Sequence, residues 1–94
     1  MYQDKEKRLA HSLLVGGFIE EIPIAENYSI FEMKPPQRLH NKTLKELDLR
    51  RKYDVTVLAI RRGGKFIVNP SAEEVIVQND ILVVLGRREK IGVM

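Results

Sequence analysis

The stretch NKTLKELDLRRKYDVTVLAIRRGGKFIV, residues 41–68, decides the fold because its hydrophobic period changes halfway. Residues 41–52 place leucines three positions apart among charged residues, which is the spacing of an amphipathic helix. Residues 55–61 and 65–69 are instead rich in β-branched and other apolar residues, which is typical of strands. Two adjacent glycines between them favour a tight hairpin with positive φ. The stretch therefore predicts one helix followed by an antiparallel strand pair.

Local side-chain signals support the predicted helix. Thr43, with Glu46 three positions later, matches the capping box, in which side chains and backbone satisfy donors at the helix start. Asn41 is an alternative N-cap. Asp48 lies four residues before Lys52, which is the favourable orientation for an ion pair on a helix surface. We therefore expect one continuous amphipathic helix that packs against an apolar surface.

The segments on either side extend the strand pattern. Residues 18–24 and 28–34 predict two more strands, the first at a sheet edge or a bulge because Pro23 cannot donate to a ladder. Residues 81–86 are almost wholly apolar, so we expect a central, buried strand there. Residues 87–94 resemble the start of a final short helix or a frayed end. The predicted order of elements is β-β-α-β-β-β.

This order determines the fold class. A doubly wound sheet needs alternating strands and helices, and a single main helix cannot provide them. We therefore predict an α+β fold in which a largely antiparallel sheet packs against one main helix. Residues 1–17 carry leucines at helical spacing and end in two glycines, so we expect the remnant of a linker helix from a longer protein. Residues 18–94 would then form the folded domain.

Composition narrows the class of protein. A chain of 94 residues forms one domain with a thin hydrophobic core, and domains of this size are commonly stabilised by oligomerisation. There are no cysteines, which excludes disulfides and thiolate metal sites. Uncharged apolar runs such as residues 55–60 are far too short to cross a bilayer, so no direct membrane insertion is expected.

The charge balance leaves two interpretations open. The net charge is +3 and the pI is about 9.3. These values fit either a mildly basic soluble protein or a protein with a basic pocket for an anionic ligand. A nucleic-acid groove is not expected, because the basic residues are interleaved with acidic ones instead of forming a block.

The sequence contains no catalytic motif. His11 and His40 are the only histidines, and neither belongs to a helical metal-binding spacing. No serine lies in a Gly-x-Ser-x-Gly elbow, and neither glycine pair extends to a phosphate-binding loop. We therefore expect a protein that is not an enzyme and has no metal site.

The most informative candidate site is the loop at residues 35–42. Two prolines precede Arg38, His40, Asn41 and Lys42, and the loop leads onto the N-terminus of the predicted helix. Helix N-termini present amides without partners and a partial positive charge, which suit an anion. The alternative is that the loop only caps the helix and its basic residues are solvated.

An ordered series of motifs resembles a known family. Residues 41–50 look like the segment G-K-T-L-x-E-L-x-L-R of the TrkA C-terminal domain, also called the C-terminal domain of regulators of K⁺ conductance (RCK). Residues 55–62 resemble the next strand of that family, and residues 79–86 resemble its closing strand, G-D-x-L-x-V-x-G. The resemblance covers residues 18–87.

Two positions depart from the family pattern. His40 and Asn41 stand where many members have a small residue and a glycine, which alters the loop of the candidate site. Asn79 replaces the glycine before the aspartate. This second change is mild, because asparagine tolerates left-handed backbone better than most residues.

The resemblance implies a regulatory role. Such domains form homodimers in the cytoplasm, usually follow a Rossmann-like nucleotide-binding domain, and serve a membrane potassium channel or transporter. In some bacterial members the dimer binds cyclic di-AMP in its interface cleft, so this cyclic dinucleotide is the candidate ligand here. Carried over to this sequence, the resemblance nominates as ligand-binding residues Ile30, Arg38, His40, Asn41, Lys42 and Ile60.

Other functions compete with this one. A purely structural dimerisation module would share the fold and bind no ligand. The domain could also regulate a transporter of another cation or anion. A nucleic-acid binder would be a third class, but the sequence carries no aromatic stacking motif for it.

Overall fold

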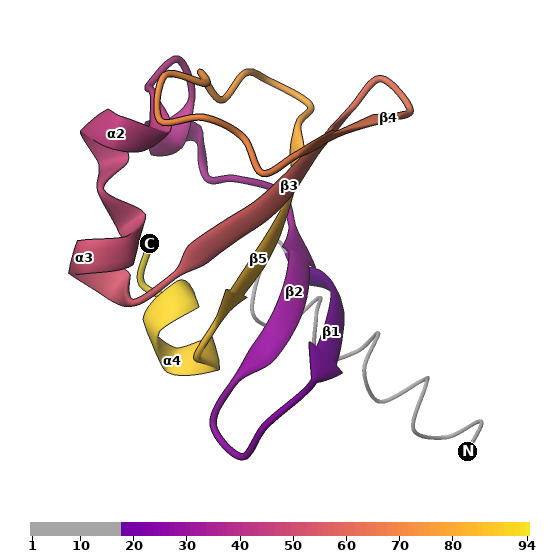
Figure 1. Cartoon of the computed structure of the whole chain (residues 1–94), viewed down its shortest axis with the longest axis vertical. Coiled ribbons are helices and arrows are strands. Elements are labelled where there is room, and N and C mark those ends of the chain that lie inside the picture. Colours follow the sequence, from indigo (N-terminus) through magenta and orange to yellow (C-terminus); the bar gives the residue numbers. More distant parts are fainter. Residues whose placement is uncertain (1–17) are drawn as a thin grey trace.

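The computed structural model of the chain describes residues 18–94, so the expected linker helix at residues 1–17 lies outside the described residues. Five antiparallel strands form one sheet in the order β1-β2-β5-β3-β4 (Figure 1). Their bounds are Phe18–Pro23 (β1), Ser29–Met33 (β2), Thr56–Arg62 (β3), Lys65–Val68 (β4) and Ile81–Gly86 (β5). The predicted α+β class and the mostly antiparallel sheet are confirmed.

The helical segments are short. They are the 3₁₀ turn η1 (Gln37–Leu39) and the α-helices α2 (Leu44–Leu47), α3 (Leu49–Tyr53) and α4 (Arg88–Ile91). Helices α2, α3 and α4 lie on the same side of the sheet (Figure 1). The expectation of a short helix after the last strand is confirmed by α4.

The predicted single helix over residues 41–52 is wrong in one respect, because it is broken at Asp48. This residue has φ 50° and ψ 45°, the left-handed conformation that aspartate tolerates better than most residues. Its carboxylate pairs with Arg51, three residues on, and not with Lys52 as the spacing suggested. The break turns one amphipathic helix into two short ones, α2 and α3, with a bend between them (Figure 1).

The start of α2 agrees with the sequence prediction. Thr43 is the N-cap, its hydroxyl accepts a hydrogen bond from the Glu46 amide at 3.0 Å, and Glu46 Oε1 accepts one from the Thr43 amide at 2.8 Å. The capping box is therefore confirmed. Asn41 is not the cap, and instead it has a left-handed backbone with φ 65°.

The core lies between the sheet and the helices. One face of β2, β5 and β3 supplies Phe31, Val84 and Ile60, which are fully buried. Outside the sheet, the core is completed by Leu39, Leu49, Val55, Ile76, Ile91 and Met94. The sheet is therefore covered on one face by the helices and the C-terminal residues.

The opposite face of the sheet stays open, and we call it the open sheet face. Register places Ile22, Ile30 and Leu85 in one row across β1, β2 and β5, and Val83 and Val68 in a second row. Exposure is 49% for Ile22 and 68% for Val68. Strand β5 is central as predicted, but only its helix-facing residues are buried.

A buried ion pair fixes the long connection between β4 and β5. Arg62 Nε and Nη2 each donate to one oxygen of Asp80 at 2.8 Å, and Nη2 also donates to the carbonyl of Val75 at 2.9 Å. The second Asp80 oxygen further accepts from the Val77 amide at 2.9 Å. Asp80 is only 1% exposed. Arg62 of β3 therefore holds residues 75–80 against the sheet.

Candidate ligand-binding site

The loop from the end of β2 to the start of α2 contains four of the six nominated residues. The end of β2 lies beside the start of β5, because Met33 pairs with Leu82. The loop after β2 and the turn before β5 therefore meet at one edge of the molecule. Two adjoining hollows form there.

The larger hollow has a volume of about 570 Å³ and is lined by Gln37, His40, Asn41 and Gln78. The smaller one, about 230 Å³, is lined by Lys34, Pro35, His40, Gln78, Asn79, Asp80 and Ile81. His40 and Gln78 belong to both. We call these two hollows the loop site. Their walls are mainly side-chain amides and an imidazole, groups that donate and accept hydrogen bonds without carrying a fixed charge.

Seven of the nine lining residues were not nominated from the sequence: Lys34, Pro35, Gln37, Gln78, Asn79, Asp80 and Ile81. Of these, Gln37, Gln78 and Asn79 add side-chain amides to the walls around His40. Gln78 and Asn79 immediately precede the last strand. The pairing of β2 with β5 brings them to the loop, and this pairing is the signal that could have identified them.

The helix N-terminus is not available to an anion. The amides of Leu44 and Lys45 donate to the carbonyls of Glu74 (3.0 Å) and Ala72 (2.9 Å). The Thr43 and Glu46 amides are taken by the capping box, and the Asn41 amide donates to Ile76 O at 2.6 Å. The expectation of unoccupied amides is therefore wrong, because a distant segment of the chain satisfies them. An anion at this site would rely on side chains.

The basic residues of the loop differ in their contacts. The Arg38 guanidinium donates to the carbonyl of Val93 at 3.3 Å and is exposed. His40 Nε2 lies 3.2 Å from the carbonyl oxygen of Pro35, which can only accept, so Nε2 is the donor. Lys42 is exposed, and its carbonyl accepts from the Ile76 amide at 3.0 Å.

Backbone conformation explains both departures from the family pattern. Asn41 and Asn79 have φ values of 65° and 74°, in the left-handed region. Glycine enters this region without steric penalty, and asparagine is among the few other residues that do so readily. The two asparagines therefore preserve the backbone path while adding an amide side chain to the loop site.

The remaining two nominated residues lie elsewhere. Ile30 is on the open sheet face, and the three residue steps along β2 from Ile30 to Met33 span roughly 10 Å. Ile60 is on the helix-facing side and is 0% exposed, so no surface-bound ligand touches its side chain in this conformation. Of the six nominated residues, only His40 and Asn41 line the loop site. Arg38 and Lys42 belong to the same loop but line neither hollow, and Ile30 and Ile60 lie elsewhere in the sheet.

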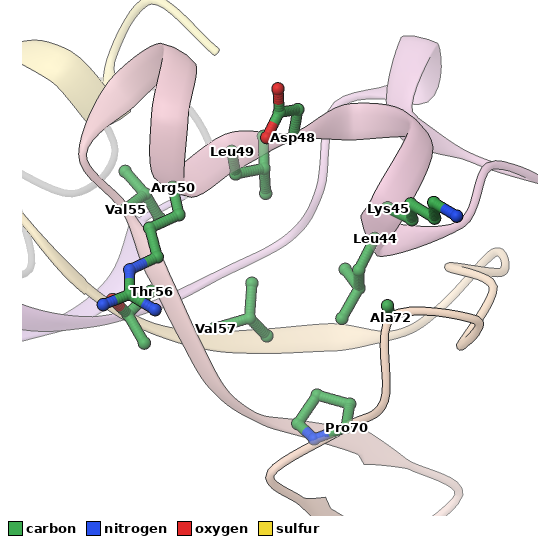
Figure 2. Close-up of a pocket in the computed structure, with 10 residues that line it drawn as sticks. All are labelled: Leu44, Lys45, Asp48, Leu49, Arg50, Val55, Thr56, Val57, Pro70 and Ala72. Carbon is green, nitrogen blue, oxygen red and sulfur yellow. The ribbon is translucent and has the colours of Figure 1, made fainter.

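A third hollow, of about 330 Å³, lies between the helices and the start of β3 (Figure 2). We call it the helix groove. It is lined by Leu44, Lys45, Asp48, Leu49, Arg50, Val55, Thr56, Val57, Pro70 and Ala72. None of the six nominated residues lines it.

Two further features of the described residues bear on function. Residues 18–94 contain no cluster of three histidine or carboxylate side chains arranged to hold a metal ion. Within the same residues, no helix has the length and apolar character needed to span a membrane.

Comparison with known proteins gives a consistent family. The chain is 40% identical over 84 residues to the Ktr system potassium uptake protein C of Bacillus subtilis (strain 168), a match that covers 89% of this chain and 38% of that protein. It is also 32% identical to the Ktr system potassium uptake protein A of the same organism, covering 95% of this chain and 40% of that protein. The chain thus spans about two fifths of the length of these relatives.

Two solved structures share the fold. The first is the RCK C domain of potassium transport protein KtrA in complex with cyclic di-AMP, with a TM-score of 0.64 and 30% identity, covering 68% of this chain and 75% of that one. The second is the RCK_C domain dimer of Streptococcus agalactiae BusR with the same ligand, with a TM-score of 0.57 and 26% identity, covering 69% and 80%. The sequence model of the TrkA-C domain matches residues 28–93. The chain therefore belongs to the TrkA-C domain family.

Proposed function

We propose that this chain is the ligand-sensing and dimerisation domain of a regulator of potassium uptake or conductance. The observation that carries the proposal is the family match over residues 28–93, together with 40% identity to a Ktr potassium uptake protein. In the longer protein, the domain would act in the cytoplasm on a membrane potassium channel or transporter. It would do so without catalysis and without entering the bilayer.

The proposed homodimer forms through the open sheet face. Exposed apolar residues on a small domain mark contact surfaces, and Ile22, Phe66 and Val68 are 49%, 57% and 68% exposed. A second copy packed there would bury them on both sides. The related BusR domain was solved as a dimer, which supports a homodimer, and the exposed apolar residues are the reason for placing it on this face.

The proposed ligand is a cyclic dinucleotide such as cyclic di-AMP, which the KtrA and BusR domains hold in their solved complexes. The amides of Asn41 and Gln78 suit the hydrogen-bonding edges of a purine base. Arg38 and Lys42 would offset the phosphate charge. Ile30, about 10 Å from the loop along β2, would contribute an apolar wall if the ligand spans two protomers.

Such a ligand would regulate through the orientation of the two protomers. A ligand shifts the equilibrium between two orientations only to the extent that it binds one of them more tightly than the other. A ligand that contacts the loop of one protomer and the open sheet face of its partner would have this property, because it would bind tightly only the orientation that brings both surfaces to it.

The test is calorimetry with cyclic di-AMP on a chain shown to be dimeric by light scattering. We expect one ligand per two chains, and at least about tenfold weaker binding for Arg38→Ala and for His40→Ala. Lys52→Ala is the matched control, since Lys52 lies on α3 outside the loop site. If a confirmed dimer does not bind cyclic di-AMP, the ligand part of the proposal is wrong.

A ligand-independent dimerisation module is the second candidate. One observation favours it: the amides at the start of α2 are all occupied by the chain itself. It predicts a stable dimer whose transport regulation in the full-length protein does not change on Arg38→Ala or His40→Ala.

A further inference from the structure

The helix groove has an apolar interior. Figure 2 shows that Leu44, Leu49 and Val57 point toward one another across it, with Pro70 and Ala72 closing one side. Leu44 and Val57 are partly exposed even though they pack against the core. Their exposed surface therefore lines a concave site, which is the setting in which an apolar ligand group gains most from leaving water.

The rim of the groove is cationic. Lys45 and Arg50 are exposed, and neither forms an ion pair within residues 18–94. Arg50 extends along one end of the groove beside Thr56 (Figure 2). Asp48 is the only acidic residue in the lining, but its side chain points away from the interior and pairs with Arg51. The groove therefore combines an apolar floor with two uncompensated positive charges.

We propose that the helix groove is a second ligand site, which binds a small amphipathic anion: a short acyl or aryl group that carries one carboxylate. The apolar group would lie against Leu44 and Val57, and the carboxylate would face Arg50 or Lys45. The volume of about 330 Å³ matches the lower end of small-molecule sites. The net positive rim disfavours basic partners, including the lysine- and arginine-rich loops that flank membrane helices.

A ligand bound in the helix groove would also affect the loop site, because one hydrogen-bonded segment of backbone connects the two. Leu44 and Lys45 line the groove, and their amides donate to the segment at residues 72–74. That same segment continues to Ile76, which exchanges hydrogen bonds with Asn41 and Lys42. A ligand that holds Leu44 and Lys45 in place would therefore also steady the backbone of the loop. The groove proposal itself does not depend on cyclic di-AMP.

The experiment is a titration of the isotopically labelled chain with sodium octanoate, followed by amide chemical shifts. We expect saturable shifts that concentrate at Leu44, Val57 and Ala72. The double variant Lys45→Glu/Arg50→Glu should weaken binding at least about tenfold. The control Lys52→Glu/Lys65→Glu changes the net charge equally outside the groove and should leave affinity within about twofold.

Two further measurements separate the contribution of the apolar contact from the contribution of the carboxylate charge. Octanol, which keeps the acyl chain but lacks the charge, should bind the groove more weakly than octanoate. Ala72→Leu should reduce octanoate binding by filling the groove without altering any charge, and circular dichroism would check that this variant is folded.

Three outcomes overturn the proposal. The first is no saturable binding, and the second is shifts that map to the open sheet face. The third is tighter binding at the same residues by a short acidic peptide with one leucine, which would make the groove a protein-docking site.

Discussion

At the scale of single residues, Asp80 has the most demanding environment. Burial alone would raise the pKa of this carboxyl, but the hydrogen bonds from Arg62 and Val77, together with the charge of Arg62, outweigh burial and hold the pKa below its ordinary value. The hydrogen bond and charge of Asp80, together with those of Glu74, raise the pKa of Arg62 above its usual range. The pair is therefore ionised at neutral pH.

We predict that Asp80→Asn destabilises the domain by about 2–3 kcal/mol, because it leaves Arg62 without its buried partner. Urea unfolding at neutral pH measures this change. Because Arg62 is partly exposed, a loss below about 0.5 kcal/mol would mean that solvent replaces the carboxylate.

The wild-type chain should also lose stability in acid. Above the ordinary carboxyl pKa of about 4, Asp80 is ionised in both states and its full contribution is present. As the pH falls below about 4, the unfolded chain takes up the proton first, so stability declines. Thermal unfolding between neutral pH and about pH 3 should show this decline, and Asp80→Asn should show less of it.

Asn41 gives a second prediction at this scale. Its φ of 65° suits asparagine or glycine and strains other residues. Asn41→Gly should stay within about 0.5 kcal/mol of the wild type, and Asn41→Ala should cost about 1 kcal/mol. Thermal unfolding of both variants tests this, and equal losses would show that the side-chain amide, not the backbone, matters there.

At the scale of elements, short sequence patterns correctly predicted those features of helices and strands that depend on contacts between residues close in sequence. The capping box at Thr43, the glycine hairpin between β3 and β4, and the central position of β5 all followed from short-range patterns. The break at Asp48 did not, because the helical spacing of the leucines continues through it. The occupied amides of α2 could not be foreseen either, since their acceptors lie about thirty residues away.

The capping box provides the prediction at this scale. Thr43→Ala removes the hydroxyl that accepts from the Glu46 amide and should cost about 1 kcal/mol. It should also speed amide hydrogen exchange at Glu46. Thr56→Ala, at an exposed position of β3, serves as the control and should leave that exchange unchanged.

At the scale of the whole molecule, the sheet is covered on one face only. The apolar sequence of β5 suggested burial on both faces, yet Ile81, Val83 and Leu85 are only partly covered within one chain. This apolar pattern is accounted for by the dimer interface proposed on the open sheet face. This is also why Ile30 could be nominated from a resemblance and still lie apart from the loop.

We predict that Val68→Lys on the open sheet face produces monomers. Val68 is 68% exposed on the edge strand β4, so the charge is tolerated in one chain but not between two. Sedimentation should show at least about tenfold weaker association with unchanged unfolding of the monomer. A dimer as stable as the wild type would place the interface elsewhere.

The strand order also has a consequence for how the chain is made. Strands β1 and β2, and strands β3 and β4, form two hairpins of neighbours in sequence, and β5 is synthesised after both hairpins. An isolated hairpin is marginal in water, so neither hairpin is stable alone. The sheet closes only when β5 inserts between them, and until then both hairpins expose the edges that β5 will occupy. A chain that ended at residue 80 would keep both of these edges unpaired, and we expect it to aggregate more readily than the chain that includes β5.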